Sequence, residues 1–236
     1  MWQNYVCLLA FLASAHCQNV SGSAPKKRVT VGLIVSEHIL PESIAWSRCG
    51  GAIGIALDKL REEYNFEDFE FRFLVGYSEC DLAETLGLGI EYMGKQNADI
   101  VIGPPCPQAG LMMAHLSNIY RTAWMGWGYV TNPEFALADK YPFVTALIAP
   151  SSTIGDCALE VIAEFKWDII SILYTSNEVR FCDDIVDSVM SSIGDSSASF
   201  VPTVAVKQVL DVNNNESYTR ILRQVQSRSR GKFTLS

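Results

Sequence analysis

Asp99-Ile-Val-Ile-Gly103 is a short run of β-branched residues that ends at a glycine. A run of this kind, bounded by turn residues, is typical of a strand that is buried on both faces of a parallel sheet. Similar runs precede it at residues 28–36 and 70–76, and a further strand is predicted over residues 122–127. Helical patterns separate the four runs, which predicts a parallel sheet with helices on both faces.

Three helices are expected between these strands, because apolar residues recur on one helical face in each connection. The first begins near residues 41–43, Asp81 caps the second, and the third covers residues 107–119. The stripes that we expect to face the sheet are Ile53, Leu57, Leu60 and Tyr64 in the first helix, Leu82, Leu86, Ile90 and Met93 in the second, and Met112, Leu116 and Ile119 in the third.

A second α/β run begins after residues 128–150, where Gly and X-Pro pairs interrupt the rhythm. Its first helix is capped by Ser151 or Ser152, and its strands are predicted over residues 169–174 and 200–206. Helices follow each of these strands. The pattern therefore predicts a second doubly wound lobe that holds only two strands.

The predicted fold is α/β, with two parallel-sheet lobes that divide near residue 148. Lobe one covers residues 28–148 and lobe two covers residues 149–226. Two parallel strands do not make a self-sufficient core, so the second lobe is expected to be incomplete. Residues 227–236 hold too few apolar side chains for a buried strand and are expected to form a disordered tail.

Composition and charge exclude several classes of protein. The 236 residues are 49% hydrophobic, which excludes a disordered chain. Lys and Arg number 18 against 26 Asp and Glu, and a net charge of −8 disfavours a nucleic-acid binder. Beyond the N-terminal segment we find no run of about 18 apolar residues, so no membrane span is expected in this chain.

The N-terminal segment has the outline of a secretory signal peptide, predicted over residues 1–17. An uncharged apolar run at residues 5–13 is followed by small residues, although a buried N-terminal helix is the alternative. Asn19 and Asn215 each begin an N-x-Ser sequon, and Asn215 lies in a polar stretch that is typical of an exposed loop. We therefore expect a secreted, extracellular glycoprotein.

Two of the seven cysteines are placed to form a disulfide. Cys80 follows the second strand and Cys106 follows the third. Because neighbouring parallel strands bring their carboxyl ends to one rim of the sheet, these two residues can meet there. Removal of residues 1–17 would leave five cysteines, and an odd number leaves at least one thiol without an internal partner.

Catalytic motifs are missing from the sequence. It contains no G-x-S-x-G, no H-E-x-x-H and no C-x-x-C, so neither a hydrolase nor a metal centre is indicated. Trp127 and Tyr129 lie at the carboxyl end of a predicted parallel strand, which is where open α/β sheets bind ligands. Core packing and a ligand-binding role stay equally open for these two residues.

Several motifs together resemble a known family. Cys80 and Ala98-Asp-Ile-Val-Ile-Gly-Pro-Pro-Cys106 are followed by Trp124-Met-Gly-Trp-Gly128, Tyr141-Pro-Phe143 and Ala149-Pro-Ser-Ser152. Over about residues 28–230 the chain resembles the extracellular domain of receptor-type guanylate cyclases and natriuretic peptide receptors, and most of all the nematode sensory receptor cyclases. The resemblance implies a type I periplasmic-binding-protein-like fold whose two lobes close on a peptide or a small molecule.

The resemblance also implies a second disulfide, Cys157–Cys182, which would leave Cys49 as the odd thiol. It implies no cofactor, and homodimers or heterodimers with a receptor cyclase ectodomain. Pro105 stands where vertebrate members have a glycine whose N–H helps to bind chloride, and proline has no N–H. The candidate cleft residues are the ends of strands and the start of lobe two: Ser36, Glu37, Gly103, Trp127, Tyr129, Ser151, Ser152 and Tyr174.

The function expected is that of a ligand-sensing region without catalysis, because the kinase-like and cyclase domains of the family have no counterpart in these residues. The receptors of the family signal through cGMP. A secreted decoy, or a dimerisation partner of a full receptor, is an alternative that would use the same site. A secreted α/β hydrolase is a third hypothesis, which the missing nucleophile motif disfavours.

Overall fold

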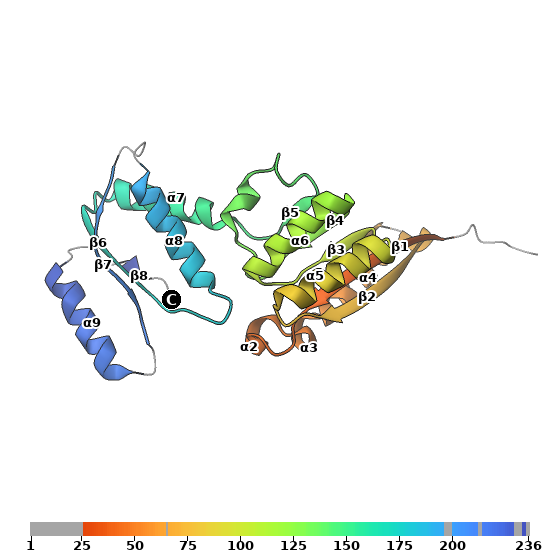
Figure 1. Ribbon diagram of the computed structural model, residues 1–236, viewed down its shortest axis with the longest axis horizontal. Coiled ribbons are helices and arrows are strands. Elements are labelled where there is room, and N and C mark those ends of the chain that lie inside the picture. The colour runs from red at the N-terminus through yellow and green to blue at the C-terminus, as the bar shows by residue number, and fades with distance from the viewer. Residues whose placement is uncertain (1–25, 65, 196–199, 212–213, 229–232, 235–236) are drawn as a thin grey trace, which may run out of the picture.

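The computed structural model describes residues 26–64, 66–195, 200–211, 214–228 and 233–234. The signal peptide expected over residues 1–17 and the sequon at Asn19 lie outside these ranges. The described chain forms two lobes that lie side by side (Figure 1). The α/β class and the two parallel sheets are as the sequence predicts.

Lobe one is built on a five-stranded parallel sheet in the order β2-β1-β3-β4-β5. The strands are β1 (Lys27–Val35), β2 (Phe69–Tyr77), β3 (Ile100–Ile102), β4 (Ala123–Gly126) and β5 (Val144–Ala146). We did not predict β5, because its three residues lie among turns and are too few to show an alternating pattern. Strand β1 lies between β2 and β3, so its end lies between theirs at the carboxyl rim of the sheet.

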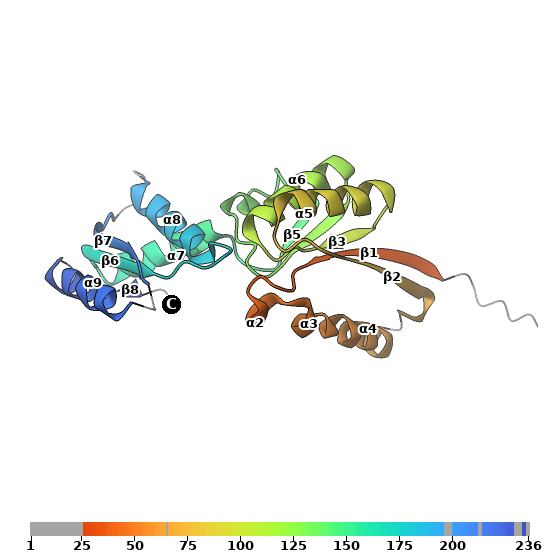
Figure 2. The ribbon, with the colours of Figure 1, turned by 60° about the horizontal axis from the view of Figure 1, so that its bottom comes forward.

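Helices cover both faces of this sheet. Figure 2 shows α4 below the sheet and α5 and α6 above it. The helices and helical turns are α2 (Pro41–Ile44), α3 (Trp46–Cys49), α4 (Gly51–Tyr64), η1 (Phe66–Asp68), α5 (Leu82–Ile90), the π-helical turn η2 (Glu91–Lys95), α6 (Pro107–Tyr120) and η3 (Pro133–Ala136).

The single helix expected from residues 41–43 onward is wrong, because two four-residue helices, α2 and α3, precede the 14-residue α4. Ala45 is extended (φ −59°, ψ 136°) and forms a parallel bridge with Ser36. The Trp46 N–H donates to the Ser36 carbonyl at 2.8 Å, which ties this break to the end of β1. The segment after β1 therefore folds back over the rim of the sheet before α4 begins.

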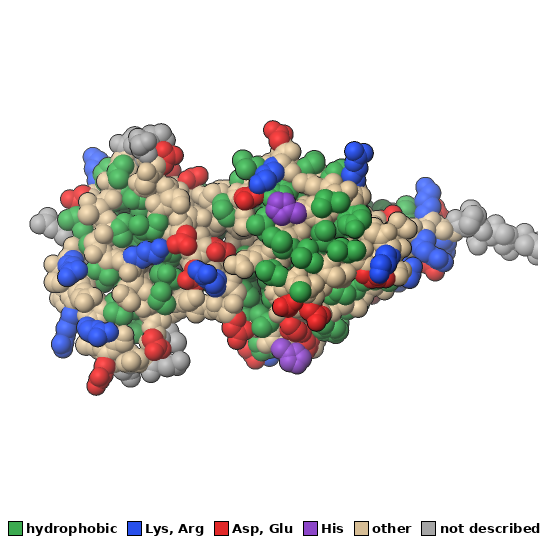
Figure 3. All heavy atoms as spheres, in the orientation of Figure 1, with side chains coloured by type: hydrophobic (Ala, Val, Ile, Leu, Met, Phe, Trp, Pro, Cys, Tyr) green, Lys and Arg blue, Asp and Glu red, His purple; other side chains and the backbone are tan. Residues whose placement is uncertain are grey.

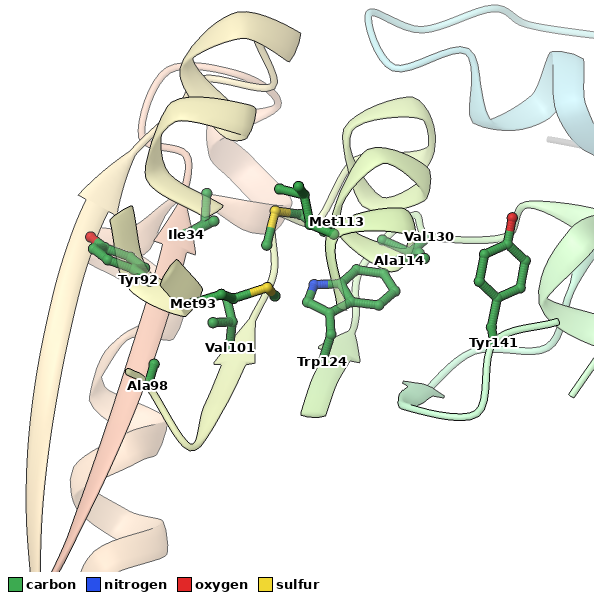
Figure 4. Packing of buried hydrophobic residues seen from close by; sticks show 11 residues of the cluster. Ile34, Tyr92, Met93, Ala98, Val101, Met113, Ala114, Trp124, Val130 and Tyr141 are labelled. Carbon is green, nitrogen blue, oxygen red and sulfur yellow. The ribbon is translucent and has the colours of Figure 1, made fainter. Parts of the chain in front are cut away.

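The larger of the two apolar clusters on the sheet of lobe one lies between the sheet and the α5–α6 pair (Figure 4). Trp124 is buried there, and its indole N–H donates to the Gly103 carbonyl at 2.8 Å. Gly89 brings α5 close to α6, because a Cβ at this position would lie 2.6 Å from Leu116 and 2.7 Å from the sulfur of Met113. Small side chains of α5 therefore face the core.

The expected inward stripes are wrong at several positions for this reason. Leu82 and Ile90 are 41% and 42% exposed, and Ile119 is 72% exposed. Met93 and Leu116 are buried as expected. In α4 the first three stripe residues are half-buried, whereas Tyr64 is 62% exposed. The outer face of α5 and α6 is consequently apolar.

Lobe two has a three-stranded parallel sheet in the order β7-β6-β8. Its elements are α7 (Ser151–Glu164), β6 (Ile169–Tyr174), α8 (Phe181–Gly194), β7 (Thr203–Val209), α9 (Asn215–Arg228) and β8 (Phe233–Thr234). The expectation of a disordered tail is wrong for β8, which pairs with Ile172 and Leu173 of β6. Strand pairing uses backbone groups, so a segment with few apolar residues can still add a strand.

The exposed loop predicted around the sequon at Asn215 is wrong at that residue, because Asn215 begins α9.

The implied Cys157–Cys182 disulfide is also wrong, since both cysteines are free thiols. The Ser188 hydroxyl donates to the Ser151 hydroxyl and Ser192 donates to Asp156, so α7 and α8 run in the same direction with an offset of 37 and 36 residues. This offset puts Cys157 level with residue 193 or 194. At 1.5 Å per residue Cys182 lies about 17 Å away along the helix axis, which a disulfide cannot span.

Candidate ligand-binding site

The two lobes meet where the strands of lobe one end. The loop between β6 and α8, residues 175–180, reaches from lobe two toward α2 of lobe one (Figure 1). The Leu40 N–H donates to the Glu178 carboxylate at 3.4 Å, and Val179 packs against the apolar cluster to which Cys80 and Cys106 belong. This is the edge at which open α/β sheets bind ligands.

A disulfide at this edge joins the segment after β2 to the segment after β3. Cys80 and Cys106 are bonded, with 5.8 Å between their Cα atoms, which confirms the predicted pair. The two strands that they follow are not neighbours as the prediction assumed, because β1 lies between β2 and β3. Cys106 is buried and directly precedes α6. The disulfide therefore ties the start of α5 to the start of α6.

Aromatic side chains make the second contact between the lobes. The Tyr129 ring meets the Phe181 ring of lobe two edge to face, with 5.0 Å between centroids. The Tyr129 hydroxyl donates to the Ser43 hydroxyl at 3.0 Å, and its N–H donates to the Pro105 carbonyl at 2.9 Å. Trp127 is half-buried in the same cluster. Both aromatic residues that the sequence singled out lie at the edge between the lobes.

A cavity of about 320 Å³ lies between the disulfide and the loop of lobe two. Such a volume suits a small ligand or the end of a larger one. Residues from both lobes line it: Ile39, residues 79–82, residues 106–109 and residues 178–180.

One wall of this cavity is held by Glu79. Its carboxylate accepts the Ser36 hydroxyl at 2.8 Å and the N–H groups of Glu37 and His38, each at 2.9 Å. Partial burial opposes the charge of Glu79, but these donors and the nearby His38 outweigh it and hold the pKa of the carboxyl below its ordinary value. Glu37 itself accepts the Ser47 N–H at 3.0 Å, and bonding to Ser47 lowers its pKa.

Most of the other residues that the sequence predicted to line the cleft are buried and do not face solvent. Ser36, Gly103, Ser151 and Tyr174 are buried. Gly103 has φ +80°, and a Cβ there would lie 2.3 Å from the Ile34 carbonyl oxygen, so only glycine fits this position. Ser151 anchors α7, because its N–H donates to the Thr131 carbonyl at 2.7 Å. Ser152 is half-buried.

Sequence reasoning missed Glu79 and the residues 178–181. The loop after β6 also follows the carboxyl end of a parallel strand, so the sequence could have predicted it as part of the ligand site. Glu79 gave no such signal, because its partners lie 41 to 43 residues away.

Two further properties concern the described residues alone. They contain no group of three or more His, Cys, Asp or Glu side chains that could hold a metal ion. Their helices are either too short or too polar to cross a lipid bilayer.

Solved structures with the same arrangement of lobes define the class of fold. A solute-binding protein of an ABC transporter from R. palustris, in complex with 4-hydroxybenzoate, superposes with a TM-score of 0.60 at 13% identity, over 89% of this chain and 54% of that one. An ABC transporter substrate-binding protein from Desulfitobacterium hafniense, in complex with Leu, gives a TM-score of 0.61 at 13% identity, over 88% of this chain and 58% of that one. The chain thus has the two-lobed fold of type I periplasmic binding proteins.

Sequence comparison narrows this class to a family. Residues 48–233 match the model of the receptor family ligand binding region, and the chain belongs to that family. It is 33% identical over 225 residues to the receptor-type guanylate cyclase gcy-4 of Caenorhabditis briggsae, and 34% identical over 209 residues to gcy-4 of Caenorhabditis elegans. These matches cover 94% and 89% of this chain but only 20% and 18% of the relatives, so the chain spans about a fifth of their length.

Proposed function

We propose that this chain is the extracellular ligand-sensing region of a receptor guanylate cyclase, and that it binds a ligand without catalysing a reaction. The observation that carries this proposal is the cavity of about 320 Å³, which residues of both lobes line at the carboxyl ends of the strands. A ligand that contacts both lobes stabilises one relative orientation of them, and a change of that orientation is a signal that other chains can receive.

Trp127, Tyr129, Glu37 and Ser152 do not line this cavity, and we propose that they face a ligand in the wider cleft around it. The buried residues Ser36, Gly103, Ser151 and Tyr174 hold the walls in place. The ligand is a small molecule or the end of a peptide, because the cavity is small and is bounded by apolar side chains, carboxylates and Arg180.

In a full-length receptor, cGMP synthesis would reside in the part of the relatives that these residues do not match. We therefore expect no GTP turnover by this chain. The resemblance to receptors, the predicted signal peptide over residues 1–17 and the sequons at Asn19 and Asn215 support an extracellular location. A secreted decoy or dimerisation partner would use the same cleft. A hydrolase is disfavoured, since neither the sequence nor the cleft presents a nucleophile with a base.

Self-association is the partner interaction that we propose, through the outer face of α5 and α6. These two helices are described throughout, carry one carboxylate, Glu84, and contain no Lys or Arg. Their exposed face is apolar, with Leu82, Ile90 and Ile119 on it, and Figure 3 shows a broad hydrophobic area over these helices. A nearly uncharged face offers a charged partner no ion pairs, whereas a second copy of the same face covers it by two-fold symmetry.

The experiment that tests ligand sensing uses the whole secreted chain. We would screen amino acids, aromatic acids and short peptides by thermal shift, and repeat each positive with Tyr129→Ala, Val179→Asp and the control Phe165→Ala. Phe165 stacks on Trp167 within lobe two, away from the cleft. Stabilisation that survives Phe165→Ala but is lost in both cleft variants supports the proposal. Binding that all variants retain contradicts a site between the lobes.

A parallel measurement addresses catalysis. Purified chain is incubated with GTP and Mg²⁺ or Mn²⁺, and cGMP is measured against a mock preparation. Turnover above the mock would contradict a purely binding function.

A further inference from the structure

Three hydrogen-bond donors converge at the end of β1. They are the hydroxyl of Ser36 and the backbone N–H groups of the next two residues, Glu37 and His38. All three lie within 2.9 Å of the oxygens of a single carboxylate, that of Glu79. Successive N–H groups that point at one place form a nest, which is an anion-binding arrangement of the backbone.

The Glu79 carboxylate reaches this nest through an unusual turn. Glu79 and Cys80 both have positive φ, 46° and 60°, although neither is a glycine. Side chains other than Gly, Asn and Asp adopt this conformation only when the surroundings impose it. The disulfide holds Cys80 from one side, and the three donors hold the Glu79 carboxylate from the other.

The donors have few other partners that could explain their convergence. The Ser36 hydroxyl oxygen also accepts the Ile39 N–H at 3.3 Å, which fixes the turn over which the nest is built. The His38 imidazole adds a fourth polar atom, with Nδ1 3.6 Å from the carboxylate. The negative charge of Glu37 repels that of the Glu79 carboxylate. The Glu37 carboxylate is itself hydrogen-bonded to Ser47.

We propose that residues 36–38 form a binding site for a small carboxylate or a similar monovalent anion, and that Glu79 occupies this site as a tethered anion of the chain itself. The site lies beside the cavity between the lobes, which Glu79 also lines. Its geometry does not depend on the ligand-sensing function, because every group in it belongs to lobe one. While Glu79 is bound, the β1 wall of the cavity has no free donors for an anionic end of a ligand.

The test removes the tether and supplies a free anion. Glu79→Gly deletes the carboxylate and relieves the left-handed backbone conformation at the same time. The melting temperature of the whole chain is measured while sodium formate replaces the sodium salt of a bulky sulfonate buffer at constant ionic strength. Formate is the probe because it is a bare carboxylate that matches the end of the Glu79 side chain.

We expect formate to raise the melting temperature of Glu79→Gly saturably, by roughly 2–4 °C when most sites are filled. The natural chain should not respond, since its site is occupied. Adding Ser36→Ala to Glu79→Gly should remove the response, because one of the three donors is lost. Lys166→Gly is the matched control, since Lys166 also has positive φ (52°) but lies in lobe two.

A flat formate response in Glu79→Gly would overturn the proposal, as would an equal response in the natural chain or in Lys166→Gly. If Glu79→Gly does not fold, Glu79→Asn replaces it, because asparagine also adopts positive φ readily and its side chain carries no charge. The same outcomes then decide the question.

Discussion

The rings of Tyr129 and Phe181 meet edge to face across the boundary between the lobes, with 5.0 Å between their centroids. Tyr129 is fixed within lobe one by its hydrogen bonds to Ser43 and Pro105. Phe181 begins α8, and its N–H donates to the Asn177 side chain at 3.0 Å. Both rings are thus held by their own lobes, and their contact reports the relative placement of the lobes.

Phe181→Ala should loosen this placement. An edge-to-face pair contributes about 0.5–1.5 kcal/mol beyond the area that it buries, so the closed arrangement loses a fraction of its stability. We expect a larger radius of gyration in small-angle X-ray scattering, with little change in circular dichroism. Phe165→Ala, which removes an aromatic pair inside lobe two, should leave the radius unchanged. Equal radii for Phe181→Ala and the natural chain would contradict a role of this contact.

Thiol mapping should find three reactive cysteines of unequal rate among the described residues. Cys157 is exposed and should be alkylated first. Burial raises the pKa of the Cys49 and Cys182 thiols, which lowers their thiolate fraction and slows them. Cys80 and Cys106 should appear as one linked peptide without reduction, and opening this loop should cost roughly 3 kcal/mol of folding stability. A linked Cys157–Cys182 peptide would contradict the helix offset described above.

The stabilising effect of Glu79 should depend on pH in a defined direction. Its pKa is lowered on folding, so the carboxylate contributes fully above the ordinary value of 4.5. The contribution is lost as the pH falls through the lower value of the folded state. The difference in free energy of unfolding between the natural chain and Glu79→Gln, measured in urea, should therefore be constant above pH 4.5 and shrink below it. A difference that grows as the pH falls would contradict this assignment.

Ile119→Glu should abolish self-association. A charge within an apolar interface must be desolvated without a partner, which is strongly unfavourable. Ile55→Glu is the matched control, because Ile55 is also 72% exposed but lies on α4, on the opposite side of the sheet. We expect sedimentation to show dimers for the natural chain and for Ile55→Glu, and monomers for Ile119→Glu. Monomers for the natural chain at every concentration would refute the interface.

Gly155→Ala should destabilise lobe two. A Cβ at this position would lie 2.8 Å from the backbone C and O of Ser188, so α7 and α8 would have to separate. Overpacking of this kind typically costs about 1–3 kcal/mol. Gly54→Ala in α4 meets no atom within 4 Å and should be neutral or stabilising, through the higher helix propensity of alanine. Urea unfolding of both variants provides the comparison.

The longer strands could be predicted from the sequence, because β-branched runs that are buried on both faces are distinctive. β5 and β8 could not, since their short segments lie among turn and polar residues, whereas the equally short β3 is a continuous Ile-Val-Ile run. The inward stripes of α5 and α6 failed for another reason: both helices are apolar on most of their surface. Thr85 and Gly89 face the core because they let the backbones approach, and hydrophobicity alone does not reveal that preference.

The candidate site also contains residues that the sequence could predict and one that it could not. The Cys80–Cys106 pair and the aromatic residues after β4 could be placed from the rule that parallel strands end at one rim, although β1 separates the two strands that the cysteines follow. Glu79 could not be placed in advance, because its role depends on a left-handed turn and on donors from a different strand.

The position of Ser151 determines how the lobes can move. In the described part of the chain the backbone passes from lobe one to lobe two once, and at that crossing the Ser151 N–H is bonded to the Thr131 carbonyl. A single covalent crossing leaves the relative orientation of the lobes to the non-covalent contacts between them. Any relative motion of the lobes must therefore turn the chain at Ser151, and hydrogen bonds link this crossing through Thr131 and Tyr129 to Pro105, the residue before the disulfide.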